Sequence, residues 1–142
     1  MIHQQNTKLV NVAPPAAKVN NGSFTCAEID TLGFDYMTVT LYLGDLDITL
    51  TVLKMQETDT SGSGYGDYSS GGAFSSLPAA TDDNKFYRFY VPLQGRKRYQ
   101  KPVVTVGNGS TGAFAAIWAE LGRAEQFPDS ASERGLGGQL FS

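Results

Sequence analysis

The sequence has too little cysteine and histidine for several kinds of chemistry. It contains one cysteine, Cys26, and one histidine, His3, in 142 residues. A lone cysteine excludes an intrachain disulfide and a Cys-rich zinc site. A Ser-His-Asp or Cys-His catalytic group would have to take its base from His3, near the N-terminus. We therefore expect no enzyme activity, cofactor or metal, and we interpret Cys26 as a small buried hydrophobe.

Charged residues and long apolar runs are also scarce. Charged residues make up 18% of the chain, and the net charge is −3. Binding to nucleic acid requires a concentrated basic surface, which this balance argues against. No apolar run reaches the length that spans a membrane, and the N-terminus lacks the charged start and apolar stretch of a secretory signal. We expect neither nucleic acid nor a membrane as a partner.

Glycine and aromatic residues are abundant, with 16 glycines and 11% aromatics, which is typical of short strands joined by turns. The strongest strand pattern is residues 36–43, where apolar and polar side chains alternate. Gly44-Asp45 then predicts a tight turn into a second strand, in which Ile48, Leu50 and Val52 face inward, so we expect a β-hairpin. The adjacent apolar pair Val52-Leu53 predicts a β-bulge near Leu53.

Three further segments, 23–29, 85–91 and 102–106, have strand patterns. The segment 85–91 is aromatic on both faces, with Phe86 and Tyr90 on one of them. A strand that is apolar on both sides either lies in the middle of a layered sandwich or faces another subunit.

The segment 107–121 can be interpreted in two ways. Residues 107–112 fit the dinucleotide fingerprint G-x-G-x-x-G, and the apolar residues that follow are spaced as on one face of a helix. The fingerprint belongs to a fold that needs several more strands than the remaining residues can form, so we do not expect a nucleotide site. As a strand, 113–121 has a face of small residues opposite Phe114 and Trp118.

A loop rich in glycine and serine covers residues 57–72 and contains Tyr65 and Tyr68. Its start imitates a calcium-binding loop, but Ser70 stands where a bidentate glutamate would be needed. Asp59-Thr60-Ser61-Gly62 is similar to the catalytic turn of aspartic proteases, but the chain has no second copy of it. We interpret the segment as a solvent loop, whose tyrosines are also typical of contact loops.

The first 22 residues contain Pro14-Pro15 and few apolar side chains. Prolines remove backbone donors and favour extended chain, so we expect residues 1–22 to form an arm. The arm is either a flexible terminus without a partner or is laid along a neighbouring molecule, with Leu9, Val10 and Val12 as contact candidates.

Two other segments are candidate contacts. Residues 129–142 form a second tail after a folded domain over 23–128, and its Leu140 and Phe141 are expected to dock on a neighbour. Arg96-Lys97-Arg98 is a basic cluster that would either contact a partner or form a salt-bridged polar rim.

The order and spacing of several segments resemble a family of small structural proteins of tailed bacteriophages, encoded with the capsid genes and often assigned as decoration (cement) or minor head proteins. The resemblance covers about residues 24–128. It is carried by Phe34-Asp35-Tyr36, Leu43-Gly44-Asp45-Leu46-Asp47, Leu53-Lys54-Met55-Gln56-Glu57-Thr58-Asp59, Leu77-Pro78-Ala79-Ala80-Thr81-Asp82-Asp83-Asn84-Lys85, Gly95-Arg96-Lys97-Arg98-Tyr99 and the Ala-Ala-Ile-Trp segment ending in Arg123-Ala124-Glu125.

The resemblance implies an all-β fold, a jelly-roll-like antiparallel β-sandwich with extended N- and C-terminal arms, and it favours a strand over 113–121. It implies a structural virion protein, made in the host cytoplasm, that binds the outer surface of the phage capsid. Such a protein would bridge neighbouring major capsid protein subunits, as a homo-oligomer (a trimer or dimer). The alternatives are a carbohydrate- or host-surface-binding module that uses Tyr65, Tyr68 and Trp118, or a head-tail completion protein.

Overall fold

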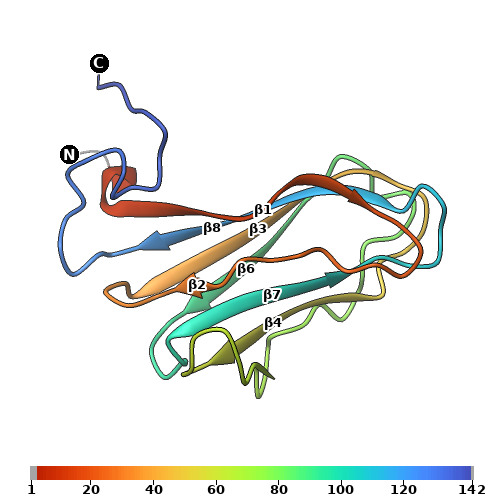
Figure 1. Cartoon of the computed structure of the whole chain (residues 1–142), viewed down its shortest axis with the longest axis horizontal. Helices are drawn as coiled ribbons and strands as arrows, with labels where there is room; N and C mark the ends of the chain where they lie inside the picture. The colour runs from red at the N-terminus through yellow and green to blue at the C-terminus, as the bar shows by residue number, and fades with distance from the viewer. Residues whose placement is uncertain (1–2, 142) are drawn as a thin grey trace.

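Two four-stranded antiparallel sheets pack face to face as a β-sandwich (Figure 1). The computed structural model describes residues 3–141, in which no helix is long and apolar enough to cross a membrane. The first sheet has the order β1-β8-β3-β6 and the second the order β2-β7-β4-β5. The elements are η1 (His3–Asn6), β1 (Thr7–Lys18), β2 (Ile29–Asp30), β3 (Tyr36–Leu46), β4 (Val52–Thr58), β5 (Gly66–Asp67), β6 (Phe86–Pro92), β7 (Tyr99–Thr105) and β8 (Ala113–Gly122). The all-β prediction is confirmed.

The core lies between the two sheets and is built from alternate residues of each strand. Burial of each of the larger aliphatic side chains contributes roughly 2 kcal/mol to stability. The buried residues of the central strands are Met37, Val39, Leu41 and Leu43 on β3, Ala113, Ala115, Ile117, Ala119 and Leu121 on β8, Leu53 and Met55 on β4, and Val104 on β7.

Strand β8 confirms the strand prediction for 113–121. It pairs with β1 on one side and β3 on the other, so its backbone is hydrogen-bonded on both sides. Its inner face is mostly alanine, which suits a crowded central position, and the outer face carries Phe114 and Trp118. The apparent helical spacing of its apolar residues is overridden by this pairing, because strand preference depends on neighbours in the sheet.

The predicted hairpin is wrong. Strand β3 continues through Gly44-Asp45 to Leu46, and the next strand, β4, belongs to the second sheet. The pairing of β3 with β8 shifts between Leu43 and Leu46, so Gly44-Asp45 forms an irregularity of the bulge type inside a strand. A glycine followed by an aspartate is compatible with both structures, and here the long partner strand β8 decides between them.

The predicted bulge near Leu53 is also wrong. Strand β4 pairs with β7 in continuous register from Val52 to Thr58. Residues 47–51 carry the chain from the first sheet to the second, with Leu50 buried on the way. The inward-facing positions change at Leu53 because the chain has crossed to the second sheet. There Leu53 and Met55 face the core from the opposite side.

Residues 7–18 correct the prediction of an N-terminal arm. They form β1, an edge strand of the first sheet that is paired along β8, with Val12 and Ala13 buried in the core. The pairing is irregular around Pro14-Pro15. An edge strand tolerates prolines because one side of its backbone needs no partner, so the prolines mark an edge here and not a detached arm.

The C-terminal segment is fastened to β1 over part of its length. The guanidinium of the buried Arg134 donates from Nε to the Gln5 carbonyl at 2.9 Å, and the Leu9 N–H donates to the Arg134 carbonyl at 2.8 Å. Gly135 has a φ of 71°, and a Cβ there would lie 1.8 Å from the Leu9 carbonyl oxygen. Beyond this point the chain leaves the sandwich, at the end where η1 also lies (Figure 1).

We predict that Gly135→Ala detaches this segment. The clash with the Leu9 carbonyl should raise the rate of trypsin cleavage after Arg134 about tenfold, because roughly 1.4 kcal/mol of added strain shifts a local opening equilibrium tenfold. Gly71→Ala is the matched control, since Gly71 has a φ of 68° but open space around it. Cleavage is followed by mass spectrometry. Equal protection of Arg134 in both variants would contradict the packing described here.

Candidate interaction surfaces

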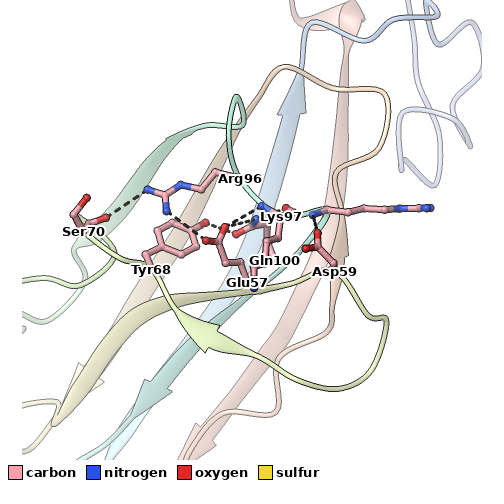
Figure 2. A network of polar contacts seen from close by, with 8 residues as sticks. Glu57, Asp59, Tyr68, Ser70, Arg96, Lys97 and Gln100 are labelled. Atoms are coloured by element: carbon pink, nitrogen blue, oxygen red, sulfur yellow. Dashed lines mark hydrogen bonds and ion pairs between the residues drawn. The ribbon is translucent and has the colours of Figure 1, made fainter.

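Gln100 on β7 is the centre of a polar network at one end of the second sheet (Figure 2). Its side chain is fully buried, and it lies opposite Glu57 in the pairing of β4 with β7. Its Nε2 donates to the Lys97 carbonyl at 2.7 Å and to Glu57 Oε2 at 3.4 Å, and its Oε1 accepts a hydrogen bond from the Tyr68 hydroxyl. A buried amide is tolerated only when both ends are hydrogen-bonded, so this network fixes Tyr68 in position.

Arg96 covers the same network from outside (Figure 2). Its guanidinium carbon lies 3.8 Å from the centre of the Tyr68 ring, a cation–π arrangement. Its Nη1 is 3.7 Å from Glu57 Oε1, and its Nη2 donates to the Ser70 carbonyl at 3.4 Å. Burial raises the pKa of Tyr68 above its usual value, so the hydroxyl stays protonated as a donor to Gln100.

Two carboxylates from the end of β4 and the loop after it hold the turn that precedes β7. The Lys97 N–H donates to Glu57 Oε2 at 3.1 Å, and the Arg98 N–H donates to Asp59 Oδ1 at 3.4 Å. Charge-assisted hydrogen bonds of this kind are stronger than neutral ones. The turn and the loop are therefore held to each other through residues about forty positions apart in the sequence.

Arg98 and Asp30 form a bidentate ion pair that joins β2 to the same turn. The Arg98 Nε and Nη2 atoms donate to the two carboxylate oxygens of Asp30, each at 2.8 Å. The hydrogen bond from Arg98 lowers the pKa of Asp30 below its usual value. The Thr31 hydroxyl donates to the Arg98 carbonyl at 2.6 Å, which adds a second link between the two segments.

Glu28 organises the glycine-serine loop. Its carboxylate accepts hydrogen bonds from the Ser61 hydroxyl at 2.6 Å, from the Gly62 N–H at 2.8 Å and from the Tyr65 hydroxyl. These donors, Ser61 first, lower the pKa of Glu28, while burial raises the pKa of Tyr65 above its usual value. The Lys101 Nζ lies 4.0 Å from the centre of the Tyr65 ring. The loop is thus folded onto Glu28 and held there.

Most of the contact candidates in the loop and the basic cluster therefore have partners within the chain. Tyr65, Tyr68, Arg96 and Arg98 are all used to fasten segments of the second sheet. These contacts fit the alternative that the basic cluster is a salt-bridged rim. The Lys97 side chain is exposed, and within residues 3–141 it has no ionic partner. A role of these residues in contacts with another protein stays a prediction.

The N-terminal candidates fall in different places. Val12 is buried in the core, whereas Leu9 and Val10 are half-buried and line a groove of about 350 Å³. The groove lies where the pairing of β1 with β8 is irregular, and Ile117 and Trp118 form its other wall. Val12 is thus a core residue of this chain.

The C-terminal candidates remain exposed. Leu140 is 91% exposed, and Phe141 is also exposed. The Arg134 guanidinium lies 5.8 Å from the Phe141 ring and donates from Nη1 to Gln139 Oε1 at 2.8 Å, which gives the segment a loose attachment. These two apolar side chains are available to a neighbouring molecule.

The outer face of the first sheet carries aromatic side chains where a sandwich usually exposes polar ones. We name it the aromatic face and define it by Tyr42 on β3, Phe86 and Tyr90 on β6, and Phe114 and Trp118 on β8. Tyr90 is 74% exposed, Phe86 64% and Phe114 49%. Tyr42 stacks on Phe86 with ring centres 4.5 Å apart, and Trp118 contacts Phe86 edge-on at 6.3 Å. Contacts within the chain bury little of this apolar surface.

Three polar residues lie among these rings. Arg88 donates from Nε to the hydroxyl of the buried Thr40 at 2.8 Å, and its guanidinium lies 5.9 Å from the Tyr90 ring. Glu120 on β8 shares the face. In the described part of the chain, neither Arg88 nor Glu120 has an ionic partner. The aromatic face therefore carries one free charge of each sign.

The alternation in 85–91 had placed Phe86 and Tyr90 on one face, and the structure confirms this. Tyr42 and Phe114 were missed as members of the same surface. Their outward phase is visible in the sequence, but only the strand order brings β8, β3 and β6 side by side. Strand pairing is non-local, so no local signal could have assembled this face.

The short motifs in the sequence do not form the sites that they imitate. The glycine-rich segment 107–112 is followed by strand β8 and not by the helix that a dinucleotide fingerprint requires. Among residues 3–141, no three His, Cys, Asp or Glu side chains gather in a group that could hold a metal ion. Burial raises the pKa of Cys26 to about 11, so the thiol is protonated, as for a packed hydrophobe.

Comparisons of the chain with protein-family models, with curated proteins and with solved structures find no match.

We predict that Gln100→Leu lowers the free energy of unfolding by about 2 kcal/mol, because the Tyr68 hydroxyl and the Lys97 carbonyl lose their partner inside the protein. Adding Tyr68→Phe should recover part of the loss by removing one orphaned group. Gln94→Leu, at an exposed glutamine in the turn before β7, is the control and should cost less than about 0.5 kcal/mol. Urea unfolding measures all three. Equal losses for Gln100→Leu and Gln94→Leu would contradict a central role of Gln100.

The Asp30–Arg98 pair makes stability depend on pH. Because the pKa of Asp30 is lower in the folded state, the pair stabilises the fold above the unfolded pKa of about 3.9 and loses this effect as the pH falls through the folded pKa. The urea midpoints of wild type and Asp30→Asn should therefore differ at neutral pH and converge toward about pH 2. Arg98→Gln should converge in the same way. A pH-independent difference would contradict this assignment.

Proposed function

We propose that this chain is a structural protein of a phage virion that binds the outer surface of the capsid and bridges neighbouring major capsid protein subunits. Its mechanism is adhesion between protein surfaces. The observation that carries the proposal is the aromatic face, because a solvated sheet with this much exposed apolar surface is typical of a protein that is completed by contact with other polypeptides.

The fold that we propose is a jelly roll. The sheet orders β1-β8-β3-β6 and β2-β7-β4-β5 support it, since all but one of the connections along the chain cross between the two layers. Jelly rolls of eight strands occur in viral capsid and lectin domains. A fold alone does not fix a function, so this likeness supports the proposal only together with the exposed surface.

The segments that carry the resemblance to phage decoration proteins include the network around Gln100. Glu57 and Asp59 lie in one of these segments, and Arg96, Lys97 and Arg98 lie in another. Their mutual contacts give these segments a physical role, because they hold the loop and the turn at one end of the sandwich in a fixed shape. A rigid loop loses less conformational entropy on binding, which favours a capsid contact at this end.

The capsid contacts that we propose are the side chains left exposed in the described structure. Lys97 lies at the network end of the second sheet, and Leu140 and Phe141 lie on the C-terminal segment. Each is a small surface, so a single contact would be weak. Repeated weak contacts on a lattice bind strongly through effective concentration, which suits a protein that bridges identical subunits.

A carbohydrate- or host-surface-binding module on the virion is the second candidate function. The groove beside Trp118 favours it, since it has an apolar lining and an aromatic wall. A glycan array discriminates between the two candidates. A head-tail completion protein is a structural variant of the first proposal and is distinguished by copy number in the virion, because a connector follows the symmetry of one portal and not that of the whole lattice.

We predict that the purified chain, added to expanded capsids that lack it, sediments with them and raises their melting temperature. The double variant Leu140→Ser/Phe141→Ser should bind more weakly because it removes the exposed apolar contacts. Leu32→Ser is the control, at an exposed leucine in the turn before β3. If the wild type neither sediments with the capsids nor stabilises them, the proposed function is wrong.

A further inference from the structure

We propose that the aromatic face is covered by a second copy of this chain, so that the protein bridges capsid subunits as a two-fold dimer. This inference rests on the proposed function for its biological meaning, but its physical argument uses the register of three strands and the side chains that they expose. It names the occupant of the aromatic face and leaves Lys97 and the C-terminal segment free for the capsid.

The strand register places the outward residues of β8, β3 and β6 in rows across the sheet. Tyr42 lies between Ala116 and Phe86, Thr40 between Trp118 and Arg88, and Thr38 between Glu120 and Tyr90. The β6 side of the face is therefore large in each row. In the same three rows, the β8 side has the small Ala116, the flat indole ring of Trp118 and the carboxylate of Glu120.

A two-fold axis parallel to β3 would make these two sides meet. Such a rotation exchanges β6 and β8 across the interface and keeps each row at its own height along the strands, as an isologous contact requires. Phe86 of one copy then lies over Ala116 of the other, which leaves room for the ring. Packed sheets keep their strands within about 30° of each other, so the rows stay matched near the axis.

The charges on the face complement each other under the same rotation. Arg88 of one copy lies over Trp118 of the other, and tryptophan forms the strongest cation–π interactions of the aromatic side chains. Tyr90 of one copy lies over Glu120 of the other, where its hydroxyl can donate to the carboxylate. Arg88 also comes within one row of Glu120, so the two charges without ionic partners in the described chain neutralise each other.

The size of the contact predicts a reversible dimer. Three strands about 4.8 Å apart and four rows about 6.8 Å apart, the three rows above and the row of Phe114, give a face of roughly 14 Å by 27 Å, about 400 Å² of flat area per copy. Such a contact, about 800 Å² over both copies, lies below the roughly 1,200 Å² at which stable specific interfaces begin and in the range of weak, transient ones. We therefore expect a dimer in concentrated solution that dissociates on dilution.

Sedimentation equilibrium and the fluorescence of Trp118 test the inference together. Trp118 is the only tryptophan of the chain, so its emission reports on this face alone. As concentration rises, the mass should move from one chain toward two and the emission should shift to shorter wavelength in parallel, because Arg88 of the second copy displaces water from the ring.

Charge reversal provides the decisive variants. Arg88→Glu and Glu120→Arg should each weaken the dimer about tenfold or more by placing like charges together, and the double variant Arg88→Glu/Glu120→Arg should restore it. Lys18→Glu makes the same charge change at the end of β1, outside the face, and should leave the dimer unchanged. A melting curve for each variant shows that the fold is retained. Failure of the double variant to restore the dimer would overturn the proposed geometry.

The experiments give different results when the dimer is wrong and when the proposed function is wrong. A wild type that stays monomeric at every concentration but sediments with capsids overturns the dimer and leaves the proposed function intact. If Phe86→Ser then abolishes capsid binding, the capsid covers the aromatic face and the second copy is excluded. A dimer that responds to charge reversal but does not bind capsids supports the inference and overturns the proposed function.

Discussion

The two-residue period of a β-strand is the constraint on which this structure depends. In each strand of the first sheet, alternate residues point into the core, and the residues between them therefore face outward. On β8 the inner residues are mostly alanine, which lets the strand lie between β1 and β3 under the second sheet. The intervening positions hold Phe114, Trp118 and Glu120. The same alternation that closes the core therefore creates the aromatic face, and the two cannot be changed independently.

The second sheet depends on a different kind of interaction. Its strands are short at the edges, and ionic and hydrogen-bonded contacts connect the segments around them. Glu57 beside Gln100, Asp30 beside Arg98, and Glu28 under the glycine-serine loop each add side-chain hydrogen bonds of a carboxylate to the short strand pairing. One layer is thus organised by apolar packing with an apolar exterior, and the other by polar contacts. This division places the exposed apolar surface on the first sheet and the loops fixed by polar contacts on the second.

Local alternation in the sequence was enough to identify β3, β6 and β7. The apolar residues of 113–121 are spaced as on a helix, and the strand there was expected from the resemblance to phage structural proteins. Local alternation could not identify partners. Gly44-Asp45 has the composition of a hairpin turn, but strand β8 extends far enough to keep β3 paired on both sides of this irregularity. Pro14-Pro15 has the composition of a loose arm, but a strand at a sheet edge accepts it. For the candidate surfaces, the basic cluster was visible in the sequence, whereas the acids that hold its turn lie about forty residues earlier and the aromatic face needs three strands in order.

The outer edge of β1 has few free backbone hydrogen-bonding groups, which limits the addition of further strands to the first sheet. The Leu9 N–H is taken by the Arg134 carbonyl, the Val12 carbonyl accepts from the Ala27 N–H at 2.8 Å, and Pro14-Pro15 has no N–H to offer. A foreign strand that approached this side would find few free donors in register, so fibril growth by edge-to-edge addition is blocked there. At high local concentration the chain can therefore crowd together without polymerising along this edge.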